Sequence, residues 1–176
     1  MKALVYTGVE ELVYREEKDP VETSGESILK VHASGICGSD MHAYHGKDER
    51  RIAPLIIGHE VSGVIQNGKF QGKNAVLNPL ITCGKCEYCT SGREHLCPHR
   101  VLLGMNKPYE RQGVFAELVS SPNQNIYEVP DHLDLNEAAI AEPTAVALHA
   151  VLMLSLIHIS EPTRRTPISY AVFCLK

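Results

Sequence analysis

The sequence lacks the features that mark membrane, secreted or nucleic-acid-binding proteins. No apolar run reaches the roughly 20 residues of a membrane span, and the richest window, residues 146–159, is interrupted by His149, Ser155 and His158. The first residues show no basic region followed by an apolar run and a cleavage site, so nothing indicates export. There is no long basic run, and the formal net charge is -4. We therefore expect a cytoplasmic protein with neither a membrane nor a nucleic acid as its partner.

Internal repeats and low-complexity linkers are also absent, and 176 residues with 44% hydrophobic content and 22% charge are typical of one globular domain. Near the start of the chain, short apolar segments alternate with turn residues, which predicts a mainly β, barrel-like fold with short helices. The expected strands are residues 1–6 paired with 12–16, then 28–31, 114–119 and 125–129. Asp131 and Asn136 are possible helix starts, and the Glu142-Pro143 step is expected to start a further helix.

Four closely spaced cysteines are the most informative feature of the chain. The gaps between Cys83, Cys86, Cys89 and Cys97 are two, two and seven residues long. This spacing lets the backbone fold around one tetrahedral zinc ion with sulfur at every position, so the predicted role is structural. A pair of disulfides and an iron–sulfur cluster are the alternatives. The missing leader argues against the disulfides, and the spacing differs from that of ferredoxin clusters.

A second group of candidate ligands is spread over two segments. Cys37 lies between Gly35 and Gly38, and we expect these glycines to aim it into a cleft by adopting backbone angles closed to other residues. His59 and Glu60 directly follow an apolar run that ends in a glycine. One sulfur, one nitrogen and one oxygen ligand leave an open position for water or an alcohol, as catalytic zinc requires. Taken singly, a lone cysteine is more often a buried apolar residue.

Together and in this order, these segments resemble the catalytic domain of the zinc-dependent medium-chain alcohol and polyol dehydrogenases. The matching segments are residues 35–42, residues 58–60, the four-cysteine loop and residues 141–150. The resemblance implies a GroES-like β-barrel domain with two zinc ions per chain, followed in the full-length protein by a Rossmann domain that binds NAD(P). It also implies a homo-oligomeric parent that oxidises a small-molecule alcohol, polyol or sugar acid.

The same resemblance assigns roles to individual residues. Cys37 and His59 are implied ligands of the catalytic zinc, with Glu60 either a further ligand or an exchangeable neighbour. Ser39 and His42 match the proton relay, which carries a proton outward while zinc acts as a Lewis acid on the substrate oxygen. Without the resemblance, Ser39 would be read as a turn hydrogen bond and His42 as a surface side chain.

Glu142 bears on the choice of substrate. Alcohol dehydrogenases of the common type place a zinc-binding cysteine at this position, whereas polyol, threonine and sugar-acid dehydrogenases have the Glu-Pro pattern present here. This departure favours a polyol or a sugar acid. Glu142 is expected either to bind the catalytic zinc, directly or through water, or to cap a helix.

The last segment does not continue the resemblance. No Gly-x-Gly-x-x-Gly turn follows, and residues 154–164 and 168–175 read as the in-frame translation of two adjoining pieces of a sequencing adapter. We therefore expect an incomplete catalytic domain over residues 1–153 and an appended artefact over residues 154–176, with a natural tail as the alternative.

The expected function follows from these assignments. The chain is predicted to be a catalytic-domain fragment of a zinc-dependent NAD(P) dehydrogenase that oxidises a secondary alcohol, polyol or sugar acid to a ketone. Without a nucleotide-binding domain to hold the hydride acceptor, the fragment alone is expected to be inactive. A zinc-stapled binding module without catalysis is the alternative. A zinc-free quinone reductase is disfavoured because it has no need for the cysteine loop.

Overall fold

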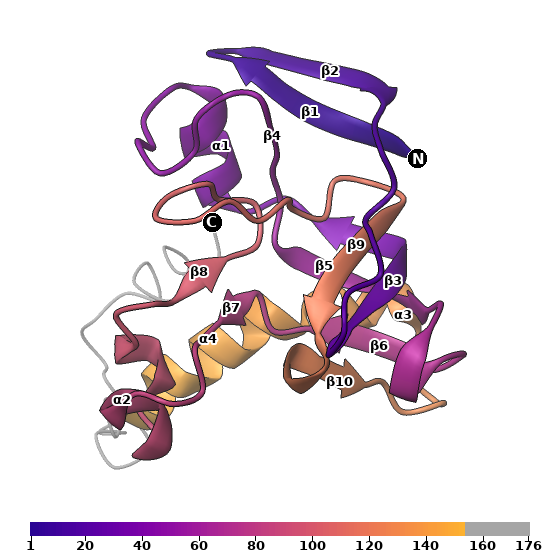
Figure 1. Cartoon of the computed structure of the whole chain (residues 1–176), viewed down its shortest axis with the longest axis vertical. Coiled ribbons are helices and arrows are strands. Elements are labelled where there is room, and N and C mark those ends of the chain that lie inside the picture. Colours follow the sequence, from indigo (N-terminus) through magenta and orange to yellow (C-terminus); the bar gives the residue numbers. More distant parts are fainter. Residues whose placement is uncertain (154–176) are drawn as a thin grey trace, which may run out of the picture. The chain divides into compact units, whose positions relative to one another are not determined.

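Residues 1–153 are the part of the chain that the computed structural model describes (Figure 1). The expectation for residues 154–176 lies outside this range. The chain divides into two compact units, of which the first is Met1–Glu142 and the second begins at Pro143. Among the described helices, none is long and apolar enough to cross a membrane. All the residues singled out as metal ligands belong to the first unit.

An N-terminal hairpin forms most of a three-stranded sheet, in the order β2-β1-β4 (Figure 1). β1 (Lys2–Gly8) pairs antiparallel with β2 (Glu11–Glu16), and β4 (Leu55–Ile56) pairs with the other edge of β1. The register places Val5 opposite Val13. The predicted pairing of residues 1–6 with 12–16 is therefore confirmed.

A five-stranded antiparallel sheet, in the order β10-β6-β5-β3-β9, positions the first candidate site (Figure 1). Its strands are β3 (Glu26–Gly35), β5 (Glu60–Ile65), β6 (Asn74–Leu77), β9 (Leu118–Pro122) and β10 (Ile126–Glu128). A separate pair, β7 (Leu80–Ile81) and β8 (Val101–Leu102), flanks the four-cysteine loop. The predicted strands at residues 28–31 and 125–129 are thus confirmed within β3 and β10.

The strand predicted at residues 114–119 is placed wrongly, because β9 begins only at Leu118. The backbone N–H groups of Val114 and Phe115 donate instead to the carbonyls of Gly58 and Ile57, at 3.1 Å each. The apolar pattern is that of a strand, but these residues pack against the turn before β5. Because Val114 and Phe115 pair with residues 57 and 58, the strand begins later than the sequence pattern predicts.

Short helices connect the strands. α1 (Gly38–Tyr44) follows β3, while α2 (Glu87–Thr90) and the 3-10 helix η2 (Glu94–Leu96) lie in the four-cysteine loop. The single turns η1 (Gly68–Phe70) and η3 (Asn123–Asn125) join strands. The mainly β architecture with short helices is therefore confirmed.

The two helices at the end of the described chain differ from their predicted starts. α3 (Leu135–Ala138) is capped by Asp134, whose Oδ1 accepts the backbone N–H of Asn136 at 2.7 Å. Neither possible start, Asp131 or Asn136, is the cap, because the carboxylate of Asp134 supplies it. α4 (Ala141–Met153) has Glu142 and Pro143 in its first turn, as the Glu-Pro step predicted.

Phe115 packs against three clusters of buried side chains in the first unit. The largest cluster lies on the five-stranded sheet and includes Leu29, Val61 and Leu103. Two smaller clusters contain apolar residues of β1 and β4. The ring of Phe115 thereby fixes both sheets against the segment that leads into β5.

Candidate metal centres

Cys37 lies at the junction between β3 and α1, where it is the N-cap residue of the helix. Its backbone N–H donates to Oδ2 of Asp40 at 3.0 Å. Asp40 is only 2% exposed, so this contact holds the first turn of α1 from inside the protein. The half-buried Cys37 side chain is consequently fixed at its base by a buried carboxylate.

The two glycines beside Cys37 do not act as predicted. Neither has a positive φ, so the expectation that they adopt angles closed to other residues is wrong. Gly35 lies opposite Glu60 in the β3–β5 pairing, and a Cβ at Gly35 would overlap Oε2 of Glu60. A Cβ at Gly38 would meet nothing within 4 Å. Gly35 is needed because it leaves space for the Glu60 carboxylate.

His59 and Glu60 are aimed by the turn that precedes β5. Gly58 has a φ of 91°, and a Cβ at this position would meet the ring of Phe115. Both the backbone conformation and the lack of space therefore require glycine. His59 and Glu60 follow as buried residues, at 5% and 7% exposure. Packing around these buried side chains therefore restricts their orientation.

The two segments bring Cys37, His59 and Glu60 together. One ligand atom from each residue lies within 4.8 Å of the others, and a sulfur, nitrogen and oxygen set suits zinc. Nδ1 of His59 and Oδ1 of Asp40 lie 3.6 Å apart, and neither buried atom has a hydrogen-bond partner among the described residues. Asp40 thus faces Nδ1 and leaves Nε2 as the ring nitrogen for a metal. The three residues fit a zinc ion with an open position.

Charge around His59 is arranged for a cation. Burial lowers the pKa of His59, but the nearby carboxylate of Asp40, together with Cys37, outweighs burial and raises this pKa to about 8. Burial raises the pKa of Glu142, while the charge of His59 opposes this shift and that of Glu60 adds to it. Acidic groups therefore surround one imidazole. The charges of His59 and Glu60 thus affect the pKa of Glu142, but Glu142 is not one of the three grouped ligand candidates.

Ser39 and His42 lie in α1, close to Cys37 in the chain. They are three residues apart and therefore share one face of the helix. Ser39 is half-buried and His42 is exposed. The hydroxyl and carbonyl oxygens of Ser39 accept from the buried guanidinium of Arg51 at 3.3 and 3.1 Å.

The sequence did not point to two of the residues that surround this site. Asp40 carried a weak signal, because an acidic residue three positions after a helix cap often accepts the N–H of that cap. Arg51 carried none, since its partners lie in three different segments.

The four cysteines of the loop also form one group. One sulfur from each lies within 4.8 Å of the others, with Sγ–Sγ distances of 3.4, 3.6 and 3.9 Å for three of the pairs. Tetrahedral zinc with about 2.3 Å bonds to sulfur separates its ligands by about 3.8 Å, whereas a disulfide needs about 2.05 Å. All four cysteines are free thiols, so the alternative of two disulfides is wrong. The backbone N–H groups of Lys85 and Cys86 lower the pKa of Cys83 to about 6. The backbone N–H of Cys89 lowers the pKa of Cys86, but desolvation and the neighbouring cysteine sulfurs outweigh it and raise that pKa to about 11.

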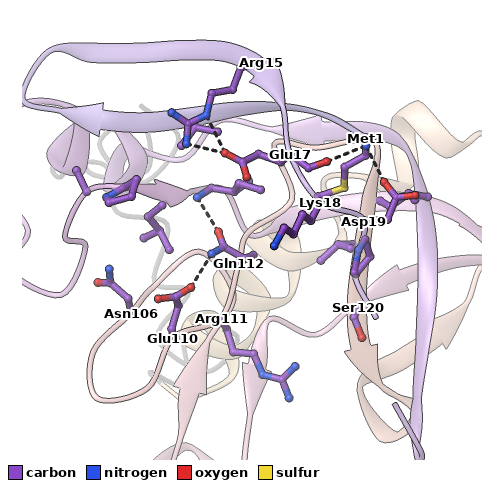
Figure 2. Close-up of a pocket in the computed structure, with 18 residues that line it drawn as sticks. Met1, Arg15, Glu17, Lys18, Asp19, Asn106, Glu110, Arg111, Gln112 and Ser120 are labelled. Carbon is purple, nitrogen blue, oxygen red and sulfur yellow. Dashed lines mark hydrogen bonds and ion pairs between the residues drawn. The ribbon is translucent and has the colours of Figure 1, made fainter. Parts of the chain in front are cut away.

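A separate hollow of about 830 Å³ lies between the N-terminal segment, the loop around Glu110 and β9 (Figure 2). Its polar lining is largely paired within itself. Arg15 contacts Glu17, the N-terminal amine contacts Asp19, and Gln112 donates to Glu110 (Figure 2). None of the metal-ligand candidates lines this hollow. The hollow is therefore separate from both metal-ligand groups.

A mainly β domain with one group of four sulfurs and one mixed group, each able to hold a metal ion, points to the catalytic domain of a zinc-type dehydrogenase. The chain belongs to the alcohol dehydrogenase GroES-like domain family, which matches residues 23–131. This match confirms the predicted GroES-like fold and the resemblance to zinc-dependent medium-chain dehydrogenases.

Individual relatives agree with this assignment. The chain is 36% identical over 168 residues to L-threonine 3-dehydrogenase of Anaeromyxobacter sp. (strain Fw109-5), covering 89% of this chain and 48% of that protein. It resembles the crystal structure of galactitol-1-phosphate dehydrogenase from Escherichia coli with a TM-score of 0.80 and 26% identity, over 88% of this chain and 45% of the other. An alcohol dehydrogenase from E. coli CFT073 complexed with NADH gives a TM-score of 0.78 and 30% identity, over 86% and 44%. The chain spans about half the length of the relatives it matches.

Proposed function

We propose that this chain is the zinc-binding catalytic part of an NAD(P)-dependent dehydrogenase that oxidises a secondary alcohol, polyol or sugar acid to a ketone. The observation that carries the proposal is the pairing of a closed group of four sulfurs with an open group of Cys37, His59 and Glu60. A binding module stapled by zinc needs only the first group. The open group, with His59 and Glu60 buried and Cys37 half-buried, leaves a position for a substrate oxygen, as catalytic zinc requires.

The two groups hold zinc in different roles. Cys83, Cys86, Cys89 and Cys97 hold a structural ion that ties the loop between β7 and β8. Cys37, Nε2 of His59 and Glu60 hold the catalytic ion, which when bound supplies Lewis acidity toward the substrate oxygen. Asp40 orients the imidazole of His59 through Nδ1, as carboxylates commonly do behind metal-bound histidines.

Ser39 and His42 supply the path for the proton that leaves the substrate hydroxyl. A guanidinium group only donates, so the Ser39 hydroxyl accepts from Arg51 and its own proton is left for a second partner. His42, exposed on the same helix face, passes the proton to solvent. Glu142 stands close enough for its pKa to respond to His59 and Glu60, and we assign it to the site as a ligand through water. Its Glu-Pro context favours a polyol or a sugar acid.

We propose that the coenzyme is bound by a further part of a longer protein, as the partial coverage of the relatives suggests. One relative is complexed with NADH. The chain covers 48% of one relative and 45% of another, so these proteins extend well beyond the matched region. We propose that the chain alone does not turn over, because it spans about half the length of the dehydrogenases it matches and hydride transfer requires the acceptor to be held beside the substrate. We also propose that residues 154–176 derive from a sequencing adapter. Long-read sequencing of the source locus tests this origin.

Zinc content tests the metal assignment. The purified chain is expected to contain two zinc ions, measured by mass spectrometry of the metal after gel filtration. Cys37→Ser is expected to leave one ion, held by the four-cysteine loop. Ser39→Ala is the matched control from the same segment, and it should keep both ions because Ser39 is not a ligand. A wild-type chain that folds but holds fewer than two zinc ions contradicts the proposal.

A further inference from the structure

Arg51 contacts the segment that carries Cys37 directly and the segment that carries His59 through Gly104, and the proposed chemistry uses it only as a donor to Ser39. Its side chain is fully buried, with 0% exposure. A buried cation is costly unless carboxylates and hydrogen-bond acceptors surround it. The contacts that compensate for burying Arg51 therefore indicate its structural role.

The guanidinium of Arg51 holds the first turn of α1. Nη1 donates to the carbonyl of Ser39 at 3.1 Å, and Nη2 donates to its hydroxyl at 3.3 Å. Nη2 also lies 3.7 Å from Oδ1 of Asp40, the carboxylate that accepts the N–H of Cys37. One side of Arg51 therefore fixes the turn that presents Cys37.

The same guanidinium supports the segment that carries His59 indirectly, through Gly104. Nε donates to the carbonyl of Gly104 at 2.9 Å. Gly104 packs directly on the backbone of Gly58, because a Cβ at Gly104 would lie 2.8 Å from the Gly58 carbonyl oxygen and 3.0 Å from its nitrogen. His59 follows Gly58 in the chain. The other side of Arg51 therefore fixes the backbone that presents His59.

We propose that Arg51 is a positioning residue that sets the distance between the Cys37 and His59 sides of the open metal site. Asp48 anchors it, since Oδ2 of Asp48 accepts from Nη1 at 2.6 Å. Lysine cannot replace it, because an ammonium group lacks the planar fork that reaches several acceptors at once. The inference rests on the proposed metal assignment.

Arg51→Lys is the test variant, and Arg50→Lys is its matched control. Arg50 is the neighbouring residue and also pairs with Asp48, at 2.9 Å, but its side chain is 61% exposed. Each zinc-loaded full chain is titrated with a chromophoric chelator, which reports the affinity of both zinc sites. Cobalt placed in the open site, with zinc kept in the four-cysteine loop, reports ligand geometry through its visible absorption bands.

Arg51→Lys is expected to weaken zinc at the open site by about 10- to 100-fold, the usual effect of losing a group that supports a metal ligand. The cobalt bands should shift, and the four-cysteine loop should keep its affinity. Arg50→Lys should change neither site. Should Arg51→Lys fail to fold, Asp48→Asn keeps the guanidinium, removes part of its anchor and should weaken the open site in the same direction.

Two results overturn the inference. The first is an unchanged open site in Arg51→Lys or, if that variant does not fold, in Asp48→Asn. The second is an equal loss of zinc from both sites, which indicates general destabilisation. A wild-type chain that holds only the four-cysteine zinc refutes the proposed function itself, so the two failures are distinguishable.

Discussion

Replacing Gly35 with alanine is expected to weaken the open zinc site while the barrel stays folded. Gly35 does not have a positive φ, so alanine suits its backbone. The new methyl group would overlap Oε2 of Glu60 and lie 3.1 Å from Cβ and 3.2 Å from Cδ of that residue. Carbon atoms pack at about 3.5–4.0 Å, so the carboxylate must swing away from Cys37 and His59.

The size of the effect follows from the loss of one oxygen ligand from a group of three. We take the loss to be at least that of removing a group that supports a metal ligand, about 10- to 100-fold in affinity, which corresponds to about 1.4–2.8 kcal/mol. Chelator competition on the zinc-loaded chain measures it. The four-cysteine loop serves as an internal reference, because Gly35 lies outside that loop.

Gly38→Ala is the matched control for this experiment. Gly38 flanks Cys37 on the other side, and a Cβ there would meet nothing within 4 Å. Its zinc affinity should equal that of the wild type. If Gly35→Ala and Gly38→Ala bind zinc equally well, the carboxylate of Glu60 does not contribute to the site, and the reasoning from space is refuted.

Two further predictions concern pH. In the metal-free chain, the imidazole of His59 should titrate near pH 8 by NMR, and zinc at the open site should bind more weakly as the pH falls below that value, because zinc takes the neutral ring. Glu26 accepts from both Arg111 and Ser120, and its pKa is lowered by Arg111, against burial, with help from Ser120. Glu26→Gln should therefore cost roughly 1 kcal/mol of unfolding free energy at neutral pH, measured by urea denaturation.

The signs of these pH effects provide the controls. The pKa of His59 is raised, so the stability it gives the metal-free chain is full below about 6.5 and is lost as the pH rises through about 8. Asp40→Asn should lower this pKa, and an unchanged titration contradicts the assignment.

The pKa of Glu26 is lowered, so its contribution is full above about 4.3 and is lost as the pH falls through the folded-state pKa. Exposed Glu22→Gln is the matched control, and a Glu26→Gln deficit that persists in strong acid refutes the ion-pair explanation.

Local patterns in the sequence determined much of this protein. The four-cysteine group could be predicted because its ligands lie within one short loop, where spacing alone limits how far apart the sulfurs can be. The hairpin of β1 and β2 was readable for the same reason, since short apolar segments on either side of a turn pair with each other. The order of Cys37, His59, the loop and Glu142 along the chain was enough to identify the family.

Only the tertiary structure decided how the open site is built. Cys37 and His59 lie in separate segments, and the register of β3 on β5 sets Gly35 opposite Glu60. Because of that register, Gly35 is needed to leave space for Glu60. The sequence context had suggested instead that Gly35 is needed for its backbone conformation. Arg51 could not be found from sequence, because its acceptors come from segments that meet only in the folded barrel. Contacts between distant segments depend on packing and strand pairing, and no pattern of neighbouring residues encodes them by itself.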